Sequence, residues 1–167
     1  GSVLHIAAHA VAKITLFFCA GAIYVATGKK YVSELAGLGK TMPITMGAFF
    51  VGSLGVIGLP PSLGFISKFH LVVGAADAGQ IALLVVFLIS TILNAAYFLP
   101  IAWQAFFPKA GTVPPEWNRP FSWSTIREAP MACVIPLATT AFLSTALFFC
   151  SGFLQELTRR FLEGLGI

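Results

Sequence analysis

The chain has 167 residues, of which 57% are hydrophobic and only 10% charged, with a formal net charge of +4 and a mean hydropathy of +0.90. A soluble domain carries roughly a quarter of its residues as charged side chains, so this chain has too few charges to solvate its whole surface. The composition therefore predicts an all-α integral membrane protein and argues against a soluble helical bundle. No basic stripe with interleaved aromatic residues is present, so nucleic-acid binding is not expected.

The first segment, which ends near Thr27, is apolar and long enough to cross a bilayer. It carries His5, His9 and Lys13 at four-residue intervals, a spacing that places them within about 80° on one helix face. A cation in the middle of a span costs about 2.5–3.5 kcal/mol on insertion scales, so it usually faces a partner or a water-filled path. The chain opens in this segment without Met or a charged leader, and we expect it to be a C-terminal piece of a longer protein.

Each of these three residues has an alternative interpretation. Lys13 could snorkel to the headgroups, but it lies about 21 Å from the end of the helix, beyond the reach of its side chain. His5 and His9 could be packed core histidines or a metal pair, although no third ligand follows them. Their alignment with Lys13 favours a proton relay, because neutral imidazole accepts on one nitrogen and donates from the other.

The next apolar segments cover about Pro43–Gly58 and Ser62–Asp77, after a segment of mixed polarity at 31–41 that we expect at the interface. One continuous helix over Thr41–Asp77 would be about 55 Å long, nearly twice the hydrocarbon thickness. Pro60 and Pro61 remove two backbone donors and disfavour helix just before them. The sequence therefore predicts a broken helix at this pair.

The broken helix has features that recur at transporter binding sites. Glycines, Gly64 among them, permit close packing around the break. Backbone groups freed at such a break can line a cavity next to ionisable residues. Lys68 follows the break as the second buried cation, and we expect it to transfer protons, whereas His70 on another face is expected to be a packing or hydration partner.

The remaining sequence predicts a helix over about Gln80–Phe107, a polar connecting loop at 108–129, a last span over about Pro130–Gly152 and an amphipathic tail. Asn94 and Tyr97 are interpreted as hydrogen-bonding groups between helices. The three cysteines show no metal or disulfide spacing and are expected to pack as small hydrophobes. No nucleophilic triad, phosphate loop or cofactor-attachment motif is present, so no catalytic centre, metal or cofactor is expected.

Two stretches, HIAAHAVAKITLFFCAGAIYVATG and LAGLGKTMPITMGAFFVGSLGVIGLPPSLGFISKF, resemble the second half of the antiporter-like proton-channel subunits. Such subunits occur in respiratory complex I (the NADH–quinone oxidoreductase), in Mrp-type multisubunit cation/proton antiporters and in membrane-bound hydrogenases. The chain most resembles the D subunits of the Mrp type. The resemblance covers about residues 1–107 and rests on the patterns HxxxHxxxK, GLGKxMP and GLPPxxGFxSK.

The resemblance implies a larger fold of two inverted repeats, each with a broken helix, to which this chain contributes about five transmembrane helices. Residues 1–107 would form most of the second proton-channel repeat, 108–129 a polar connecting loop, and 130–167 the last transmembrane helix and an amphipathic tail. The resemblance also implies that Lys13 is a mid-membrane relay lysine with His9 as its partner. Lys68 would be the lysine of the broken helix that leads to one membrane surface.

The leading interpretation is a proton-translocating subunit of a multisubunit monovalent cation/proton antiporter in the bacterial inner membrane. Its expected partners are other membrane subunits, lipid, protons and sodium ions. An alternative is the proton-pumping module of a redox-driven NADH–quinone oxidoreductase or membrane-bound hydrogenase, in which the same lysines would serve. Two further alternatives are a structural membrane subunit without an ion path and a membrane enzyme that uses the histidines with a metal.

Overall fold

A computed structural model describes residues 2–108 and 126–164, and this part of the chain is helical without strands. The long helices are α1 (Ser2–Thr27), α2 (Pro43–Ile57), α3 (Leu63–Asp77), α4 (Ile81–Phe106), α5 (Met131–Phe149) and α6 (Ser151–Gly164). Two 3₁₀ helices, η1 (Val32–Leu35) and η2 (Leu38–Lys40), lie between α1 and α2. The predicted all-α class is confirmed, and each apolar segment of the sequence forms a helix.

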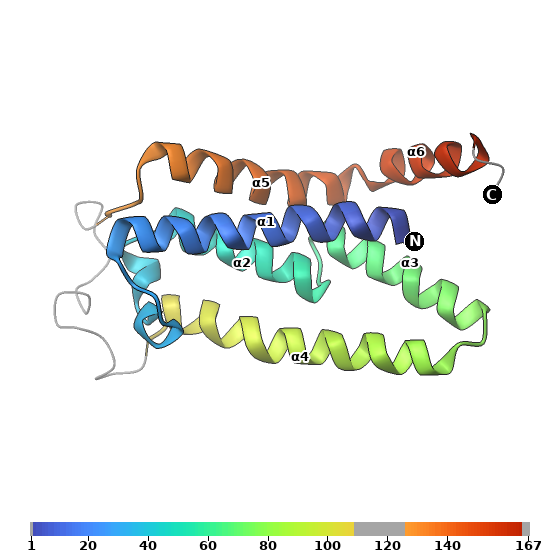
Figure 1. Ribbon diagram of the computed structural model, residues 1–167, viewed down its shortest axis with the longest axis horizontal. Coiled ribbons are helices and arrows are strands. Elements are labelled where there is room, and N and C mark those ends of the chain that lie inside the picture. The colour runs from blue at the N-terminus through green and yellow to red at the C-terminus, as the bar shows by residue number, and fades with distance from the viewer. Residues whose placement is uncertain (1, 109–125, 165–167) are drawn as a thin grey trace.

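Helix α1 lies in the middle of the bundle, between α5 on one side and α2 on the other (Figure 1). Its buried face consists mainly of small side chains, including Ala8, Ala12 and Ala22. Small residues let helices approach closely inside a membrane. A Cβ added at Gly55 of α2 would come within 2.7 Å of the Ala12 Cβ, so these two helices are in close contact.

Among the described residues, three helices, α1, α4 and α5, are long and apolar enough to cross a membrane. Helices α2 and α3 have 15 residues each and are therefore about 22 Å long. They follow one another along the long axis of the bundle, and α4 then runs back beside them (Figure 1). The arrangement is that of an integral membrane protein in which two half-length helices stand in series.

The break between α2 and α3 is where the sequence predicts it. Helix α2 ends at Ile57 and is followed by Gly58, whose φ of +85° is a left-handed conformation that favours glycine. Pro60 and Pro61 occupy the connection, and the Ser62 hydroxyl donates to the Leu59 carbonyl at 2.7 Å before α3 begins. A Cβ at Gly64 would overlap the carbonyl oxygen of Gly55, so the two half-helices approach each other through their backbones.

The predicted interfacial segment 31–41 forms the turns η1 and η2 at one end of the bundle. The Glu34 carboxylate accepts hydrogen bonds from the backbone N–H groups of Tyr31 and Lys30 at 3.0 and 3.1 Å. These bonds favour the charged form and hold the pKa of Glu34 below its usual range. The Gly37 N–H donates to the Gln104 carbonyl of α4 at 3.0 Å, which attaches the turn to the bundle.

The C-terminal part differs from its prediction in one boundary. The expected last span reached about Gly152, but α5 ends at Phe149 and Gly152 lies inside α6. Cys150 separates the two helices, and its N–H still bonds the Ala146 carbonyl of α5 at 3.1 Å. Most of the predicted polar loop 108–129, with Trp117, Arg119 and Trp123, lies outside the described residues.

Helix α6 carries the charges of the predicted amphipathic tail. The Glu156 carboxylate lies 3.1 Å from Arg159 Nη2 and 2.8 Å from Arg160 Nε. These guanidinium groups lower the pKa of Glu156 by hydrogen bonding to its charged form. The ion pairs are exposed, so they favour the helix only weakly.

Candidate functional site

The histidine–lysine row of α1, formed by His5, His9 and Lys13, runs beside the buried stripe of that helix. Each member of the row comes one position after a buried residue, and one position turns the side chain by about 100°. The buried residues are Leu4, Ala8 and Ala12. As a result His5 and His9 are half-buried, and Lys13 is exposed on the outside of the described bundle.

His5 is the member of the row that reaches across to α3. Its Nδ1 lies 3.0 Å from the hydroxyl of the fully buried Ser67, and that hydroxyl also donates to the Gly64 carbonyl at 3.0 Å. A serine hydroxyl has a single proton, so it can only accept from His5. The network therefore assigns a proton to Nδ1 of His5 and leaves Nε2 of the neutral ring as an acceptor.

The members of the row lie near one another but are not joined by direct hydrogen bonds in the described residues. The rings of His5 and His9 are 5.9 Å apart between centroids, and no hydrogen bond joins them in the described part of the chain. His9 is close enough to Lys13 and Lys68 to interact with both, and His5 interacts with Lys68. A proton moving along the row would therefore need water between the side chains, because direct bonds require about 2.7–3.2 Å.

Lys68 projects from α3 back over the helix break. Its Nζ donates to the carbonyl oxygens of Ile57 and Val56 at 2.7 and 3.1 Å and to the Thr91 hydroxyl of α4 at 3.3 Å. Both carbonyls belong to the last turn of α2, where they have no partner within the helix. Lys68 thus caps the C-terminus of α2, the negative end of the helix dipole.

The other polar residues predicted from the sequence stay outside this arrangement. His70 is exposed, and its Nδ1 contacts the Ile66 carbonyl of its own helix at 2.8 Å. Asn94 bonds to Ser90 within α4 at 3.5 Å, whereas the sequence interpretation placed its bond between helices. The amide can reach its own helix one turn back, so it needs no partner on a neighbour.

Three residues that the sequence analysis did not single out take part in the structure around the site. Ser67 and Thr91 bring hydroxyls to His5 and Lys68, and their only sequence signal is a polar residue within an apolar segment. Glu128 binds the N-terminus of α2, accepting from the Ile44 N–H at 2.7 Å and the Thr45 hydroxyl at 2.6 Å. Those partners are more than 80 residues away in sequence, so no local pattern could identify the contact.

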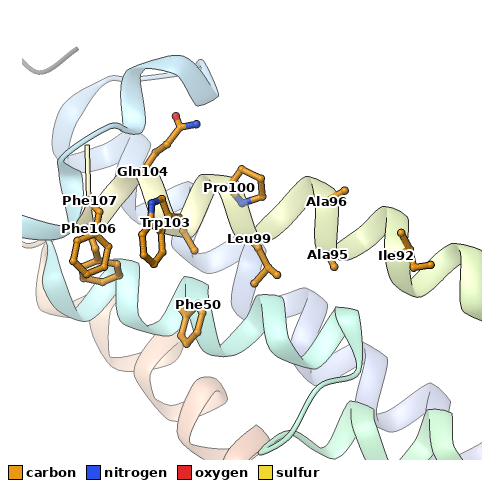
Figure 2. A pocket seen from close by; sticks show the side chains of 11 residues that line it. Phe50, Ile92, Ala95, Ala96, Leu99, Pro100, Trp103, Gln104, Phe106 and Phe107 are labelled. Carbon is orange, nitrogen blue, oxygen red and sulfur yellow. The ribbon is translucent and has the colours of Figure 1, made fainter. Parts of the chain in front are cut away.

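In the part of the chain that the structure describes, neither a metal cluster nor the apolar groove beside α4 coincides with these residues. Within residues 2–108 and 126–164, no three histidine, cysteine or carboxylate side chains are grouped so that they could hold a metal ion. A groove of about 1030 Å³ lies between α2 and α4, with Phe50 on one side and Leu99 and Trp103 on the other (Figure 2). None of its lining residues is ionisable, so the groove is apolar and separate from the candidate site.

These features define a helical membrane protein with a broken helix, whose free carbonyls hold a lysine next to a row of ionisable residues. The chain belongs to the NADH:quinone oxidoreductase/Mrp antiporter transmembrane family, whose model matches residues 1–94. The match includes the histidine–lysine row, the helix break, Lys68 and Thr91. The resemblance inferred from the sequence patterns is thereby confirmed.

Similar proteins include subunits of NADH-quinone oxidoreductases and of a Na⁺/H⁺ antiporter. The chain is 42% identical over 127 residues to an NADH-quinone oxidoreductase subunit N of Desulforudis audaxviator, covering 71% of this chain and 25% of that protein. It is 39% identical over 75 residues to the D subunit of a Na⁺/H⁺ antiporter of Alkalihalophilus pseudofirmus, covering 45% and 15% respectively. The chain thus spans a quarter or less of these curated relatives.

A solved structure shares the fold. The structure of an Mrp complex from Dietzia sp. DQ12-45-1b matches with a TM-score of 0.72 and 27% sequence identity, covering 90% of this chain and 34% of the matched chain. The likeness therefore extends beyond the family match to nearly the whole chain.

Proposed function

We propose that the chain is part of a proton-translocating membrane subunit of a multisubunit monovalent cation/proton antiporter in the bacterial inner membrane. The observation that carries the proposal is the position of Lys68, a cation inside an apolar bundle whose partners among the described residues are neutral oxygens. A carboxylate partner would fix the charge on the lysine, whereas neutral oxygens leave it free to lose and regain a proton. The likeness to a subunit of a Na⁺/H⁺ antiporter supports the choice of cation/proton exchange.

In this proposal the two ionisable groups of residues have different roles. Lys68 holds a proton at the helix break, and the row of His5, His9 and Lys13 provides stepping points along α1. His9 is close enough to both lysines to interact with them electrostatically, so it is placed between the two groups. Protons and monovalent cations are then the transported species, and the other membrane subunits of the complex are the partners.

A second candidate is the proton-pumping module of a redox-driven NADH–quinone oxidoreductase. It is favoured by the 42% identity to a subunit N over 71% of this chain. The two candidates use the same lysines, and they differ in what drives transport. Proteoliposomes containing the purified complex distinguish them: sodium-dependent proton exchange without an electron donor supports the antiporter, and proton uptake only with an electron donor and quinone supports the redox-driven module.

The direct test of the proposal is Lys68→Ala in the complete subunit, assembled in its complex. We expect the variant to assemble and to lose proton transport, because alanine cannot carry a proton at the break. Lys68→Glu should keep part of the activity, since a carboxylate can also bind and release a proton. The measurement is the change in internal pH of vesicles containing the complex.

The matched control is Lys30→Ala, which removes the same side chain from an exposed position beside the Tyr24 ring. This control should transport at the unmodified rate. Normal transport by Lys68→Ala would contradict the proposed function.

A further inference from the structure

The three oxygen atoms around Lys68 Nζ are all restricted to accepting hydrogen bonds. Two are the carbonyl oxygens of Val56 and Ile57 at 3.1 and 2.7 Å. The third is the Thr91 hydroxyl at 3.3 Å, whose own proton is donated to the Phe87 carbonyl at 2.9 Å. A hydroxyl has one proton, so towards Lys68 the threonine presents only a lone pair.

A set of three acceptors distinguishes the two protonation states of a lysine. An ammonium has three N–H donors, one for each oxygen, whereas a neutral amine has two donors and a lone pair. The neutral amine would leave one oxygen without a donor and point its own lone pair at it. The carbonyl oxygens also lie at the negative end of the α2 dipole, which adds attraction for the charged form alone.

The path of the Lys68 side chain to these oxygens depends on Gly58. A Cβ at position 58 would lie 2.5 Å from Lys68 Cδ, and the residue has a φ of +85°. The lysine stem therefore passes directly over the glycine that ends α2. The C-terminus of α2 and the Lys68 side chain of α3 therefore pack directly against each other.

We propose that the carbonyls of Val56 and Ile57 and the hydroxyl of Thr91 form a docking cradle for protonated Lys68, in which Thr91 is a positioning residue that sets how tightly the site holds its proton. The inference rests on the proposed function and names the residue that tunes it. Loss of the proton removes one donor from the cradle and weakens the attachment of the side chain, so release of the proton and release of the lysine are linked.

Among the described residues, few ionisable groups lie near the cradle. From α1, His5 and His9 face Lys68 closely enough to interact with it. On α3 itself, His70 is exposed and contacts the Ile66 carbonyl. The contacts from α2 and α4 come from backbone carbonyls and a hydroxyl, which do not titrate.

The test is the pH dependence of transport by the assembled complex with Thr91→Val. Valine keeps the shape of threonine but removes an acceptor from the ammonium, so the site should hold its proton about tenfold less tightly. The pH of half-maximal transport should then move about one unit to the acid side. Thr91→Ser keeps the hydroxyl and should restore the original profile.

The matched control is Thr139→Val on α5. Thr139 makes the same local bond as Thr91, to the carbonyl four residues back at 2.8 Å, but it is exposed and away from the lysine. The pH dependence of transport by the Thr139→Val variant should not shift. If the complex with Thr91→Val does not assemble, the complex with Thr91→Ala should show the same shift of the pH of half-maximal transport to the acid side.

An unshifted profile in Thr91→Val, or equal shifts in the valine and serine variants, would overturn the cradle. When that result is accompanied by loss of transport in Lys68→Ala, the proposed function stands without the cradle. Normal transport in Lys68→Ala would instead overturn the proposed function itself.

Discussion

Ser67 connects the two helices that carry the ionisable residues. Its hydroxyl accepts from His5 Nδ1 and donates to the Gly64 carbonyl, both at 3.0 Å, and its side chain is fully buried. The serine therefore fixes both the orientation and the tautomer of the His5 ring. Because Ser67 directly precedes Lys68 in α3, the position of the His5 ring is linked to that of the helix that carries the lysine.

Ser67→Ala should free the His5 ring without unfolding the bundle. We expect transport to slow several-fold but to persist, because a water molecule can take the place of the hydroxyl. Nitrogen NMR of the histidines should show that the protonated Nδ1 form of His5 becomes less populated. Ser90→Ala, which removes a hydroxyl from α4, is the control, and an unchanged His5 tautomer in Ser67→Ala would contradict this assignment.

At the scale of single residues, the sequence identified charged groups better than their partners. His5, His9 and Lys68 stand out because an ionisable side chain in an apolar segment is conspicuous and costly to bury. Ser67 and Thr91 do not stand out, since hydroxyls are common in membrane helices and can bond within their own helix. Only the folded structure, which brings together residues 62 positions apart for Ser67 and 23 for Thr91, reveals their contacts with His5 and Lys68.

At the scale of elements, α2 carries a charge of the appropriate sign at each end. Its N-cap residue, Met42, provides no side-chain acceptor, and the Glu128 carboxylate supplies one from the segment before α5. At the opposite end, Lys68 binds the free carbonyls. Negative charge at a helix N-terminus and positive charge at its C-terminus both interact favourably with the helix dipole, so this short half-helix is held at both ends by residues outside it.

Glu128→Ala should destabilise the protein by about 1–2 kcal/mol, because it removes the acceptors of the Ile44 N–H and the Thr45 hydroxyl together with the favourable charge. Glu128→Gln should cost less, since an amide oxygen can still accept. Thermal unfolding of the purified protein in detergent measures both changes. Glu163→Ala, which alters an exposed ion pair on α6, is the control, and equal stability of the two alanine variants would contradict the capping role.

The helix boundaries were predictable wherever glycine or proline marks them. The first helix ends at Thr27 as expected, and the break at Pro60 and Pro61 lies between the observed ends of α2 and α3. The boundary after Phe149 was not predicted, because no glycine or proline stands between Phe149 and Ser151, and the expected span continued to Gly152 inside α6. The Glu128 cap was not predictable, since its energy comes from a contact that the local sequence does not encode.

At the scale of the whole molecule, the outer faces of α1 and α4 differ in character. Helix α4 exposes apolar side chains along its length, such as Leu93, which is 63% exposed. Helix α1 also exposes apolar side chains, such as Phe17, but beside them it exposes Lys13 and half-exposes the two histidines. An apolar face is suited to lipid, whereas a row of ionisable groups requires water or polar partners in the bilayer. The chain spans a quarter or less of the length of its curated relatives. The proposed function requires a hydrated path along the row of His5, His9 and Lys13 on α1.

Chemical labelling of the assembled complex tests for that water. In a variant with Cys19, Cys133 and Cys150 changed to alanine, a cysteine introduced by His9→Cys should react with a small water-soluble thiol reagent in vesicles. A thiol reacts as its thiolate, which needs a polar surrounding, so Leu93→Cys on the apolar face of α4 should react about tenfold more slowly or not at all. Mass spectrometry of the labelled subunit gives both rates. Equal, slow labelling at the two positions would place His9 in an apolar interface without water. A proton could not then pass along α1, because no water would bridge the 5.9 Å between the centroids of the His5 and His9 rings.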